Sequence, residues 1–452
     1  MPTLVANFLA FVNTHALGSP VMRRSHPINE HQCGAWMWGN KKPGVRDITT
    51  GKSSKGSRIF GTRILISIIQ DSAADRPRHS TERRSNDARM ALQHDSPKPK
   101  RFDIVSAGNM CIDILLPIDH YPVSRGEHQR LRKNAFLEIG GSLNALLSAT
   151  RLEAKTAALA YVRGDTEGTH PSDLLLTKYL KEIAEREGIE TSGFLPHSRG
   201  TITTCAALLD SDGTHTFLAS NEEVQEHLTF NETLPRVMRD LVHQSKALII
   251  DGYALHSDRE LVEQCLDSAI ESDCEVWVDP QAATASLLQN RDDLFLRILR
   301  SAHGISLNME EARMMTAETE PERVLRALPS FLSADTVLLK DGPYGCHALV
   351  KGELGEEFCS IPGFDLSEAY KDSVGAGDAF LGAFLAGRLV HSLELRACCI
   401  LANTMAAGTC MQHGAGASGI SSISQAKQLL EANSLKNDLI LQVLSPDRQT
   451  SG

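Results

Sequence analysis

Asp372-Ser-Val-Gly-Ala-Gly-Asp378-Ala-Phe-Leu-Gly-Ala-Phe-Leu-Ala386 joins a tight glycine turn to a carboxylate and then to a run of helix-forming residues. Glycine lets the backbone approach a ligand closely, and the amides at the start of a helix point outward with a partial positive charge. The turn therefore predicts an anion site. Asp378 stands where the helix begins, so its carboxylate could act as a base beside that anion. The two features together indicate phosphoryl-transfer chemistry.

Glycine turns of this kind also occur in three different structural settings. A dinucleotide-binding G-x-G-x-x-G fingerprint would need a third glycine where Phe380 stands, and would be expected in a first βαβ unit rather than late in the chain. A P-loop needs G-x-x-x-x-G-K-[ST], a run that the sequence lacks. The remaining alternative is a structural turn in which Asp378 is an ordinary helix N-cap.

Composition and charge limit the class of protein. With 452 residues and 42% hydrophobic content, the chain can bury one large core or two ordinary ones. The first 100 residues carry 16 Lys and Arg against 7 Asp and Glu, whereas the remainder carries 30 against 49. We therefore expect a basic appendage on an acidic globule, with no nucleic-acid partner and no membrane span. The ten cysteines show no C-x-x-C pair, so we expect reduced, mostly buried thiols.

The N-terminal segment is expected to be a disordered extension over residues 1–100. It has no acidic residue before Glu30 and is rich in Ser and Arg from 79 to 89. This composition is typical of an organelle transit peptide, which predicts a plastid or mitochondrial location. A merely disordered tail or a mis-assigned start codon would give the same composition and a cytoplasmic protein.

From residue 101 onward the chain predicts alternating strands and helices. The strands are expected at 102–108, 155–162, 246–251, 274–279, 303–307 and 336–340, and the helices at 173–188, 258–272 and from 309. This alternation predicts an α/β fold with a mostly parallel sheet flanked by helices. We expect the domain to cover 101–435, followed by a flexible tail over 436–452.

Polar residues follow several of these strands directly, and ligands bind at the carboxyl ends of strands in such sheets. The polar groups are Gly108-Asn109, Asp251-Gly252, Asp279-Pro280, Asn308 and Lys340-Asp341-Gly342. An ordinary preference of turns for Gly, Asn and Asp explains each one singly, and this alternative stays open.

Two segments, near 118–138 and 200–218, break the alternation and predict short strands and hairpin turns. We expect them to form a small β lid over the polar rim. Its edge strands could pair between subunits, giving a homodimer.

Four motifs in order along residues 102 to about 425 resemble those of the ribokinase/pfkB-type carbohydrate kinases. They are Gly140-Gly-Ser-Leu-Asn144 followed by Gly164-Asp165, then Asn308-Met-Glu-Glu311, Lys340-Asp-Gly342-Pro-Tyr-Gly345, and the opening run from Asp372 to Asp378. The resemblance implies a ribokinase-like three-layer sandwich, with ATP and Mg²⁺ as cofactors. The chain looks most like plant and algal members of that family.

The resemblance also assigns roles to residues. Asp378 would be the general base, and the amides of Gly375, Ala376 and Gly377 would stabilise charge on the transferring phosphoryl group. Glu311 and Asn308 would serve the magnesium ion, with Glu311 holding it through water, although an N-capped helix explains the same pair. Asp372 and the loop from Met411 to Ser418 match the place where family members bind a monovalent cation such as K⁺.

The resemblance assigns different residues to the two substrates, the acceptor sugar and the nucleotide. The acceptor sugar would be bound by Asp113, Gly140, Gly141 and Asn144, although Asp113 could also be a solvated turn residue. Only two residues separate Gly141 from Asn144, where three are common in the family. Because of this departure, the resemblance does not identify the sugar. The nucleotide would lie along Lys340, Gly342, Gly345, Asn403 and Gly414, and core packing is an equal explanation for the helix around Asn403.

The sequence therefore predicts an ATP-dependent kinase that phosphorylates a hydroxyl of a sugar. A nucleoside kinase on the same scaffold is the first alternative. The second, from another class, is a catalytically silent organellar protein with an assembly or regulatory role; it is disfavoured because Asp378 and the glycine turn are both retained.

Overall fold

The computed structural model describes residues 99–445 apart from 127, 166–168, 198–201, 211–214, 221–234, 329–331, 333, 353–354, 434 and 436. The N-terminal extension and its expected targeting role lie almost entirely outside the described residues, as does the end of the chain from residue 446.

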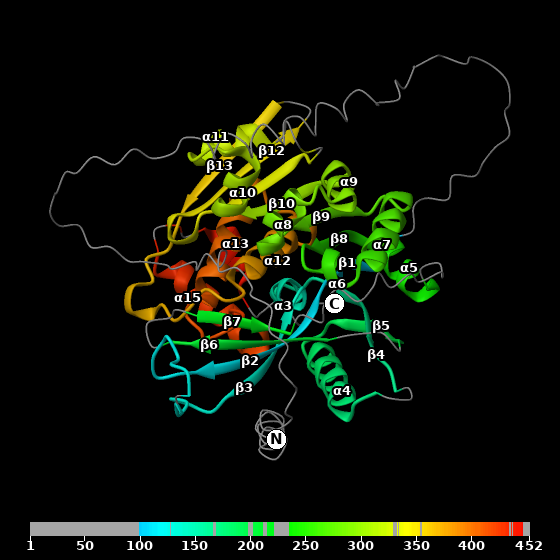
Figure 1. Cartoon of the computed structure of the whole chain (residues 1–452). Helices are drawn as coiled ribbons and strands as arrows, with labels where there is room; N and C mark the ends of the chain where they lie inside the picture. The colour runs from blue at the N-terminus through cyan, green and yellow to red at the C-terminus, as the bar shows by residue number, and fades with distance from the viewer. Residues whose placement is uncertain are drawn as a thin grey trace, which may run out of the picture. The chain divides into compact units, whose positions relative to one another are not determined.

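A large twisted sheet forms the frame of the described part (Figure 1). It has nine strands in the order β13-β12-β11-β10-β9-β8-β1-β4-β5 over the described residues. The strands from β11 through β5 in that order run parallel, while β12 and β13 add an antiparallel hairpin at one edge. Their bounds are β1 (Phe102–Ala107), β4 (Thr156–Arg163), β5 (Glu190–His197), β8 (Ser245–Asp251), β9 (Glu275–Asp279), β10 (Gly304–Asn308), β11 (Thr336–Lys340), β12 (Gly345–Gly352) and β13 (Gly355–Pro362).

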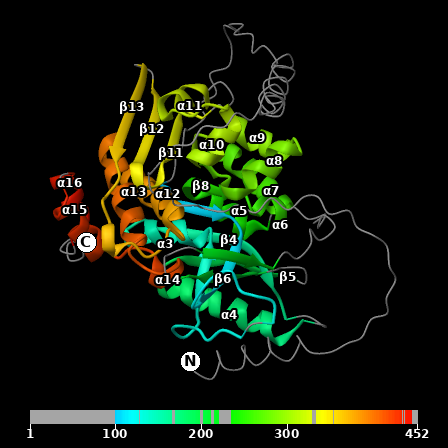
Figure 2. The same cartoon turned by 60° about the vertical axis from the view of Figure 1, so that its left-hand side comes forward.

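Helices cover both faces of this sheet, which gives three layers (Figure 2). The α-helices are α3 (Leu143–Arg151), α4 (Pro171–Arg186), α5 (Arg236–His243), α6 (Ala254–Ser257), α7 (Arg259–Glu271), α8 (Thr284–Gln289), α9 (Asp293–Ser301), α10 (Met309–Thr316), α11 (Pro321–Ala327), α12 (Ala376–Leu389), α13 (Leu395–Thr409), α14 (Gly416–Gly419), α15 (Ile423–Glu431) and α16 (Asp438–Val443). Three short 3₁₀ turns are also described: η1 (Gln281–Ala283), η3 (Gly342–Tyr344) and η4 (Ser367–Ala369).

Successive side chains along the buried strands point to opposite faces of the sheet and pack into two separate hydrophobic cores. In β8, Ile249 packs with α3, α12 and α13, whereas its neighbours Leu248 and Ile250 pack with α5, α7 and α9. Both faces of a parallel sheet are buried in this way, which explains why its strands read as nearly continuous apolar runs. The predicted α/β class with a mostly parallel central sheet is confirmed.

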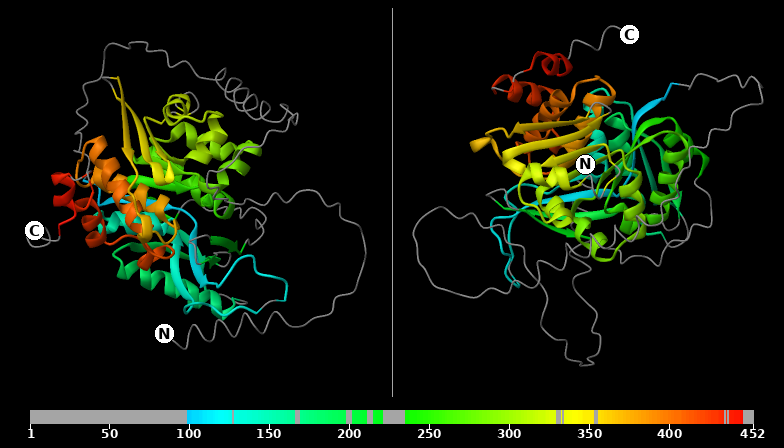
Figure 3. Two further views of the ribbon diagram at one scale, coloured as in Figure 1. Left: turned by 90° about the vertical axis from the view of Figure 1, so that its left-hand side faces the viewer. Right: turned by 90° about the horizontal axis from the view of Figure 1, so that it is seen from above.

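A second, four-stranded sheet lies beside the first, in the order β3-β2-β6-β7 over the described residues (Figure 3). Its strands are β2 (Met110–Pro117), β3 (Phe136–Gly141), β6 (Thr203–Leu209) and β7 (His215–Ala219). β2 pairs antiparallel with β3 and parallel with β6, and β7 closes the sheet antiparallel to β6. β6 and β7 lie in the segment near 200–218 that was expected to form a lid. In the segment near 118–138 the described residues before Phe136 form no strand, which differs from the prediction, and β2 is a strand of this sheet that we did not expect.

One expectation about local structure was wrong. The tail expected from residue 436 is not a tail where it is described, because residues 438–443 form α16 and both Ile440 and Leu444 are fully buried. The alternative that Asp113 is a solvated turn residue is excluded, because Asp113 lies in the middle of β2 with its side chain buried. Within the described ranges, moreover, the helices are all too short or too polar to cross a membrane.

Candidate active site

The carboxyl ends of five neighbouring parallel strands bring the predicted polar residues to one edge of the sheet. Strands β11, β10, β9, β8 and β1 are adjacent in that order, so Lys340, Asn308, Asp279, Asp251 and Gly108 follow one another along the edge. Because these strands are parallel neighbours, their carboxyl ends lie side by side, and the preference of turns for Gly, Asn and Asp stays an alternative explanation for the residue types. The sequence prediction of a polar rim is confirmed by this arrangement.

The glycine turn sits at the start of α12, above this edge. Gly375 is the N-cap and has φ 74°, in the left-handed region that favours glycine. A Cβ on Gly375 would lie 2.7 Å from the Cβ of Ala415. Of the amides predicted to form the anion site, that of Ala376 already donates to the Ser373 carbonyl at 3.2 Å. The positive end of a 14-residue helix nevertheless points toward the space next to Asp378.

Two side-chain amides hold the Asp378 carboxylate. Asn144 Nδ2 donates to Oδ2 at 3.3 Å, and Gln281 Nε2 donates to Oδ1 at 3.0 Å. Burial, followed by the negative charge of Asp279, raises the pKa of Asp378 to about 7, against the opposing influence of Lys340 and Asn144. A carboxylate with a pKa near neutrality is suited to accept a proton during catalysis.

Lys340 lies directly beside the turn. Its Nζ pairs with Asp279 Oδ2 at 2.6 Å, with both side chains largely buried. The same Nζ is 3.3 Å from the position that a Cβ on Gly377 would occupy. Burial lowers the pKa of Lys340, but Asp279 and Glu311 outweigh it, so the pKa is raised overall and the ammonium stays charged. The glycine turn is therefore backed by a fixed positive charge.

Asn308 and Glu311 form a reciprocal capping box at the start of α10. Glu311 N–H donates to Asn308 Oδ1 at 2.9 Å, and Asn308 N–H donates to Glu311 Oε2 at 2.8 Å. The N-cap interpretation of this pair is confirmed. Burial raises the pKa of Glu311 to about 7, with Lys340 opposing the rise. This carboxylate thus lies within electrostatic reach of the Lys340–Asp279 pair.

The acceptor residues gather between the lid strands and the large sheet. Asp113 Oδ1 accepts from the Cys111 thiol at 3.0 Å, and burial raises the pKa of Asp113. Gly140 leaves room for that carboxylate, because a Cβ there would lie 2.4 Å from Asp113 Oδ2. Gly141, at φ 66°, packs against the Asn109 carbonyl, where a Cβ would come within 2.0 Å. The two glycines therefore allow the close packing around Asp113 and Asn109.

A chain of hydrogen bonds ties Asn144 to the loop before α14. Asn144 Oδ1 accepts from Gly416 N at 3.0 Å while its amide group donates to Asp378. In the same loop, Gly414 N donates to Asp372 Oδ2 at 2.9 Å, and Asp372 Oδ1 accepts from Val374 N at 3.0 Å. Asp372 thereby fixes the glycine turn to the 414–416 loop.

Several of the predicted nucleotide residues lie around the junction of β11, β12 and β13. Gly345, at φ 103°, packs against the Ile361 carbonyl of β13, and Asn403 Nδ2 donates to the Pro362 carbonyl at 2.9 Å. Gly342 has φ 56°, and none of the described atoms lies within 4 Å of a Cβ built there. Gly345 is also next to Lys340, because Asp341 N donates to the Gly345 carbonyl at 2.8 Å and Lys340 pairs with Cys346. Lys340, Gly345, Pro362 and Asn403 are therefore linked across β11, β12, β13 and α13.

Sequence reasoning gave no role to two residues that contact the site. Gln281, which donates to Asp378, belongs to no recognised motif, because the two residues are 97 positions apart and leave no spacing signal. Asp251 was noted only as a strand end. Its Oδ2 accepts from Asn109 N at 2.7 Å and its Oδ1 from Ala254 N at 2.8 Å, and burial raises its pKa to about 7.

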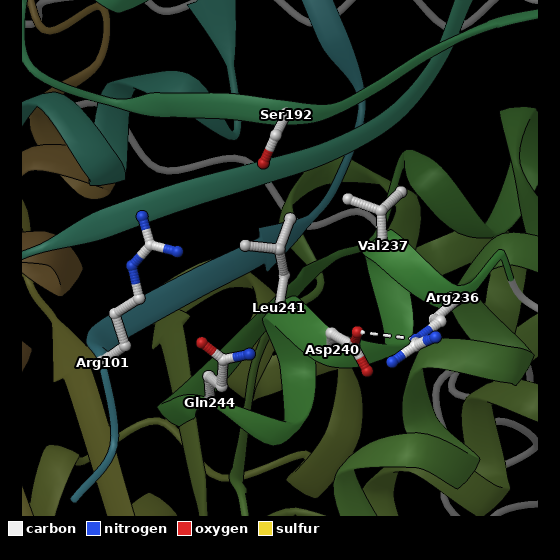
Figure 4. Close-up of a pocket in the computed structure, with 7 residues that line it drawn as sticks. All are labelled: Arg101, Ser192, Arg236, Val237, Asp240, Leu241 and Gln244. Atoms are coloured by element: carbon white, nitrogen blue, oxygen red, sulfur yellow. Dashed lines mark ion pairs between the residues drawn. The ribbon is translucent and has the colours of Figure 1, made fainter.

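A surface pocket on the described part lies away from this chemistry (Figure 4). Arg101, Ser192 and Gln244 line it together with residues of α5. Arg101 and Gln244 precede β1 and β8, so the pocket is at the amino-terminal edge of the sheet, opposite Asp378. It is therefore no part of the candidate active site.

Known proteins resemble the chain over this same region. A profile of the "pfkB family carbohydrate kinase" matches residues 106–422. An uncharacterised sugar kinase of Archaeoglobus fulgidus is 28% identical over 275 residues, covering 60% of this chain and 96% of its own length. A 5-dehydro-2-deoxygluconokinase of Bacillus subtilis is 22% identical and covers 74% of this chain and 98% of its own length. A putative ribokinase II of E. coli, solved with ATP and Mg²⁺, has a TM-score of 0.59 at 15% identity, covering 74% of this chain and all of its own.

Proposed function

Because the chain belongs to the pfkB family of carbohydrate kinases, phosphotransferases that act on a sugar hydroxyl, we propose that Asp378 is the general base of an ATP-dependent sugar kinase. The observation that carries this proposal is the Asp378 carboxylate itself. It stands at the positive end of α12, is held by Asn144 and Gln281, and has a pKa raised to about 7. A base so placed can take a proton from an acceptor hydroxyl near neutral pH.

The proposed reaction assigns each group one task. The acceptor hydroxyl loses its proton to the Asp378 carboxylate as its oxygen attacks the γ-phosphorus of ATP. The bond from that phosphorus to the β–γ bridging oxygen breaks, and ADP leaves. The turn from Gly375 to Gly377 and the charged Lys340 stabilise negative charge on the transferring phosphoryl group. Afterwards the proton passes from Asp378 to solvent.

ATP and Mg²⁺ are the cofactors that we propose. Magnesium keeps much of its water shell and usually binds through one or two carboxylates together with substrate phosphates. Glu311 is a fitting contact, since its buried carboxylate lies in the first turn of α10, within electrostatic reach of Lys340 and Asp279. Within the described ranges, no three His, Cys, Asp or Glu side chains form a ready metal cluster. When bound, the ion would neutralise phosphate charge.

A K⁺ requirement through the loop from 411 to 418 and Asp372 remains a prediction, testable by replacing K⁺ with Na⁺.

The acceptor side of the site favours a neutral, hydroxyl-rich molecule. Burial, followed by Asp113, Cys205 and Asp251, raises the pKa of Cys111. Burial, followed by Asp251 and Asp378, raises the pKa of Tyr253 to about 12. Carboxylates bind hydroxyl donors well but repel anions. We therefore propose that neutral sugars are phosphorylated in preference to sugar acids such as the substrate named for the Bacillus subtilis relative.

A binding and turnover panel tests this function. The purified full chain would be heated with neutral pentoses and hexoses, 5-dehydro-2-deoxygluconate and nucleosides, each with a non-hydrolysable ATP analogue, because a true ligand raises Tm by mass action. ADP release with ATP then identifies the acceptor. A neutral sugar as the preferred acceptor supports the proposal. Adenosine or pseudouridine in its place would favour a nucleoside kinase, and stable capture of a protein with no ADP release would favour the silent alternative.

Two further properties remain proposals. The expected homodimer would form through the lid, where the outer strand β7 exposes Phe217 and Leu218 on the described surface. Sedimentation of the wild type and of Leu218→Lys tests it, since a monomeric wild type contradicts it. The plastid or mitochondrial location is testable by imaging a fusion of residues 1–100 to a fluorescent protein.

A further inference from the structure

Gln281 occupies a backbone conformation that its residue type disfavours. Its φ is 51°, in the left-handed region, where glycine and asparagine are common and a long side chain is strained. Strain of this kind persists only where the surroundings impose it, and it concentrates at functional sites. The side chain of Gln281 ends on the Asp378 carboxylate, with Nε2 donating to Oδ1 at 3.0 Å.

The main chain around Gln281 is fixed on both sides. Before it, the Asp279 carbonyl accepts from Gly252 N at 3.0 Å, and the Asp279 carboxylate holds Lys340 at 2.6 Å. A Cβ on Gly252 would lie 2.0 Å from the Pro280 carbonyl oxygen, so these backbones are in close contact. After it, the Gln281 carbonyl accepts from Thr284 Oγ1 at 2.7 Å. The ends of β8 and β9 therefore hold Gln281 in its strained conformation.

We infer that Gln281 is a positioning residue for the proposed base. Its amide holds Asp378 Oδ1 so that the free lone pairs of the carboxylate face the acceptor hydroxyl. Asn144 fixes Oδ2 from the opposite element, α3. Each oxygen then keeps a lone pair for the incoming proton. This inference rests on the proposed role of Asp378, and it adds a residue from the η1 turn that no kinase motif in the sequence includes.

The position of Gln281 predicts an effect on proton transfer. Its N–H stabilises the charged form of Asp378, so its removal raises the pKa of that carboxyl. The base is active when deprotonated, and the acid limb of kcat should therefore move to higher pH. The other groups that act on Asp378 are unchanged by this substitution: Asp279 of β9, Lys340 of β11, Asp251 of β8, Asn144 of α3 and the neighbouring Tyr253.

Gln281→Gly is the informative variant, because it removes the amide and relieves the backbone strain together. We expect Tm to stay or rise, kcat to fall about tenfold and the acid limb to move up by about 0.5 to 1 pH unit, with KM for ATP unchanged. Gln281→Asn tolerates the same φ but is one methylene too short to reach Asp378, so it should match Gln281→Gly. Gln281→Glu keeps the length but places a carboxylate against the base, and should give the largest upward shift.

Arg291 supplies a matched control. It has the same φ of 51° and is exposed, so Arg291→Gly relieves equal strain at a distance from the site and should leave kcat and its pH profile unchanged. A second control combines Gln281→Gly with Asp378→Asn in single-turnover reactions. If Gln281 acts through Asp378, the double variant is no slower than Asp378→Asn alone, whereas an independent structural role would make the two losses additive.

The outcomes separate the two hypotheses. Near-normal turnover of Asp378→Asn would overturn the proposed function. If Asp378→Asn is inactive while Gln281→Gly and Gln281→Asn keep wild-type kcat and an unmoved acid limb, only the inference about Gln281 is wrong. Additive losses in the double variant would overturn it as well.

Discussion

Replacing Asp378 by Asn should make the protein slower and, above neutral pH, more stable. The rate change follows from the loss of a base. General-base catalysis contributes about a hundredfold to ten-thousandfold, and a hundredfold loss corresponds to about 2.7 kcal/mol in the barrier. We therefore expect kcat to fall at least about a hundredfold while the binding of an ATP analogue is retained.

The stability change follows from the raised pKa. A carboxyl whose pKa is 3.8 when unfolded and about 7 in the fold opposes folding once it ionises, by roughly 4 kcal/mol above pH 7. The gain in the free energy of unfolding from Asp378→Asn is smaller than this, because Asp378 keeps partial solvent exposure. In addition, the new NH₂ group meets the amide donor of Asn144 or Gln281 and cannot accept a hydrogen bond from it. We expect a gain of about 2 kcal/mol at pH 8, under about 1 kcal/mol at pH 5 and none below pH 4.

Urea unfolding at several pH values measures this gain without any substrate. Asp372→Asn is the matched control, since Asp372 is also buried near the turn but accepts from the amides of Val374 and Gly414. That variant should lose about 1 to 3 kcal/mol at pH 8, because it turns an acceptor into a donor. A destabilised Asp378→Asn at pH 8, or a gain that does not grow between pH 4 and 7, would refute the reasoning.

Three further predictions follow from the same site. The rate of the wild type should fall on the acid side with a midpoint near pH 7, since Asp378 must be deprotonated, and a flat steady-state profile from pH 5.5 to 8 would contradict this. Lys340→Met should lower the free energy of unfolding by about 3 to 5 kcal/mol because it leaves the Asp279 carboxylate buried without its partner; adding Asp279→Asn should recover part of the loss in urea unfolding. Gly375→Ala should cost about 2 kcal/mol, since its φ is 74° and its Cβ would press on Ala415, whereas Gly342→Ala, with open space around it, should cost about 1 kcal/mol in the same measurement.

The parallel part of the fold could be predicted because its physical signal is local. A strand buried on both faces is an apolar run, and the polar residue that ends it marks the ligand edge, as Asp251 and Lys340 do. The edge hairpin gave a weaker signal. In β13 only Cys359 and Ile361 are buried, so Gly355–Pro362 has the composition of a loop.

Site residues could be predicted where they belong to a compact sequence motif. They could not be predicted where residues far apart in the sequence meet only in the folded protein. Asp378 and the glycines of the turn are adjacent in sequence, so the turn predicts where the helix begins. For Asp113 the sequence leaves a turn open as an alternative to a sugar contact, because Gly108 and Asn109 end the preceding strand, and only the pairing of β2 with β3 and β6 shows that the chain re-enters a sheet. The contact of Gln281 with Asp378 depends on tertiary packing alone.

The strand order also has a consequence for synthesis of the chain. β1 is the first of these strands to be made but lies between β4 and β8, and α12 and α13, which cover much of one face of the sheet, are made after all of the strands. At about 5 to 20 residues per second, a ribosome takes roughly 10 to 30 seconds to pass from the end of β8 to the end of α13. Throughout that interval the face around Ile249 is covered by α3 alone, and the part that α12 and α13 cover stays exposed. The nascent kinase should therefore bind chaperones that recognise exposed apolar surface, and fragments that stop before residue 376 should aggregate.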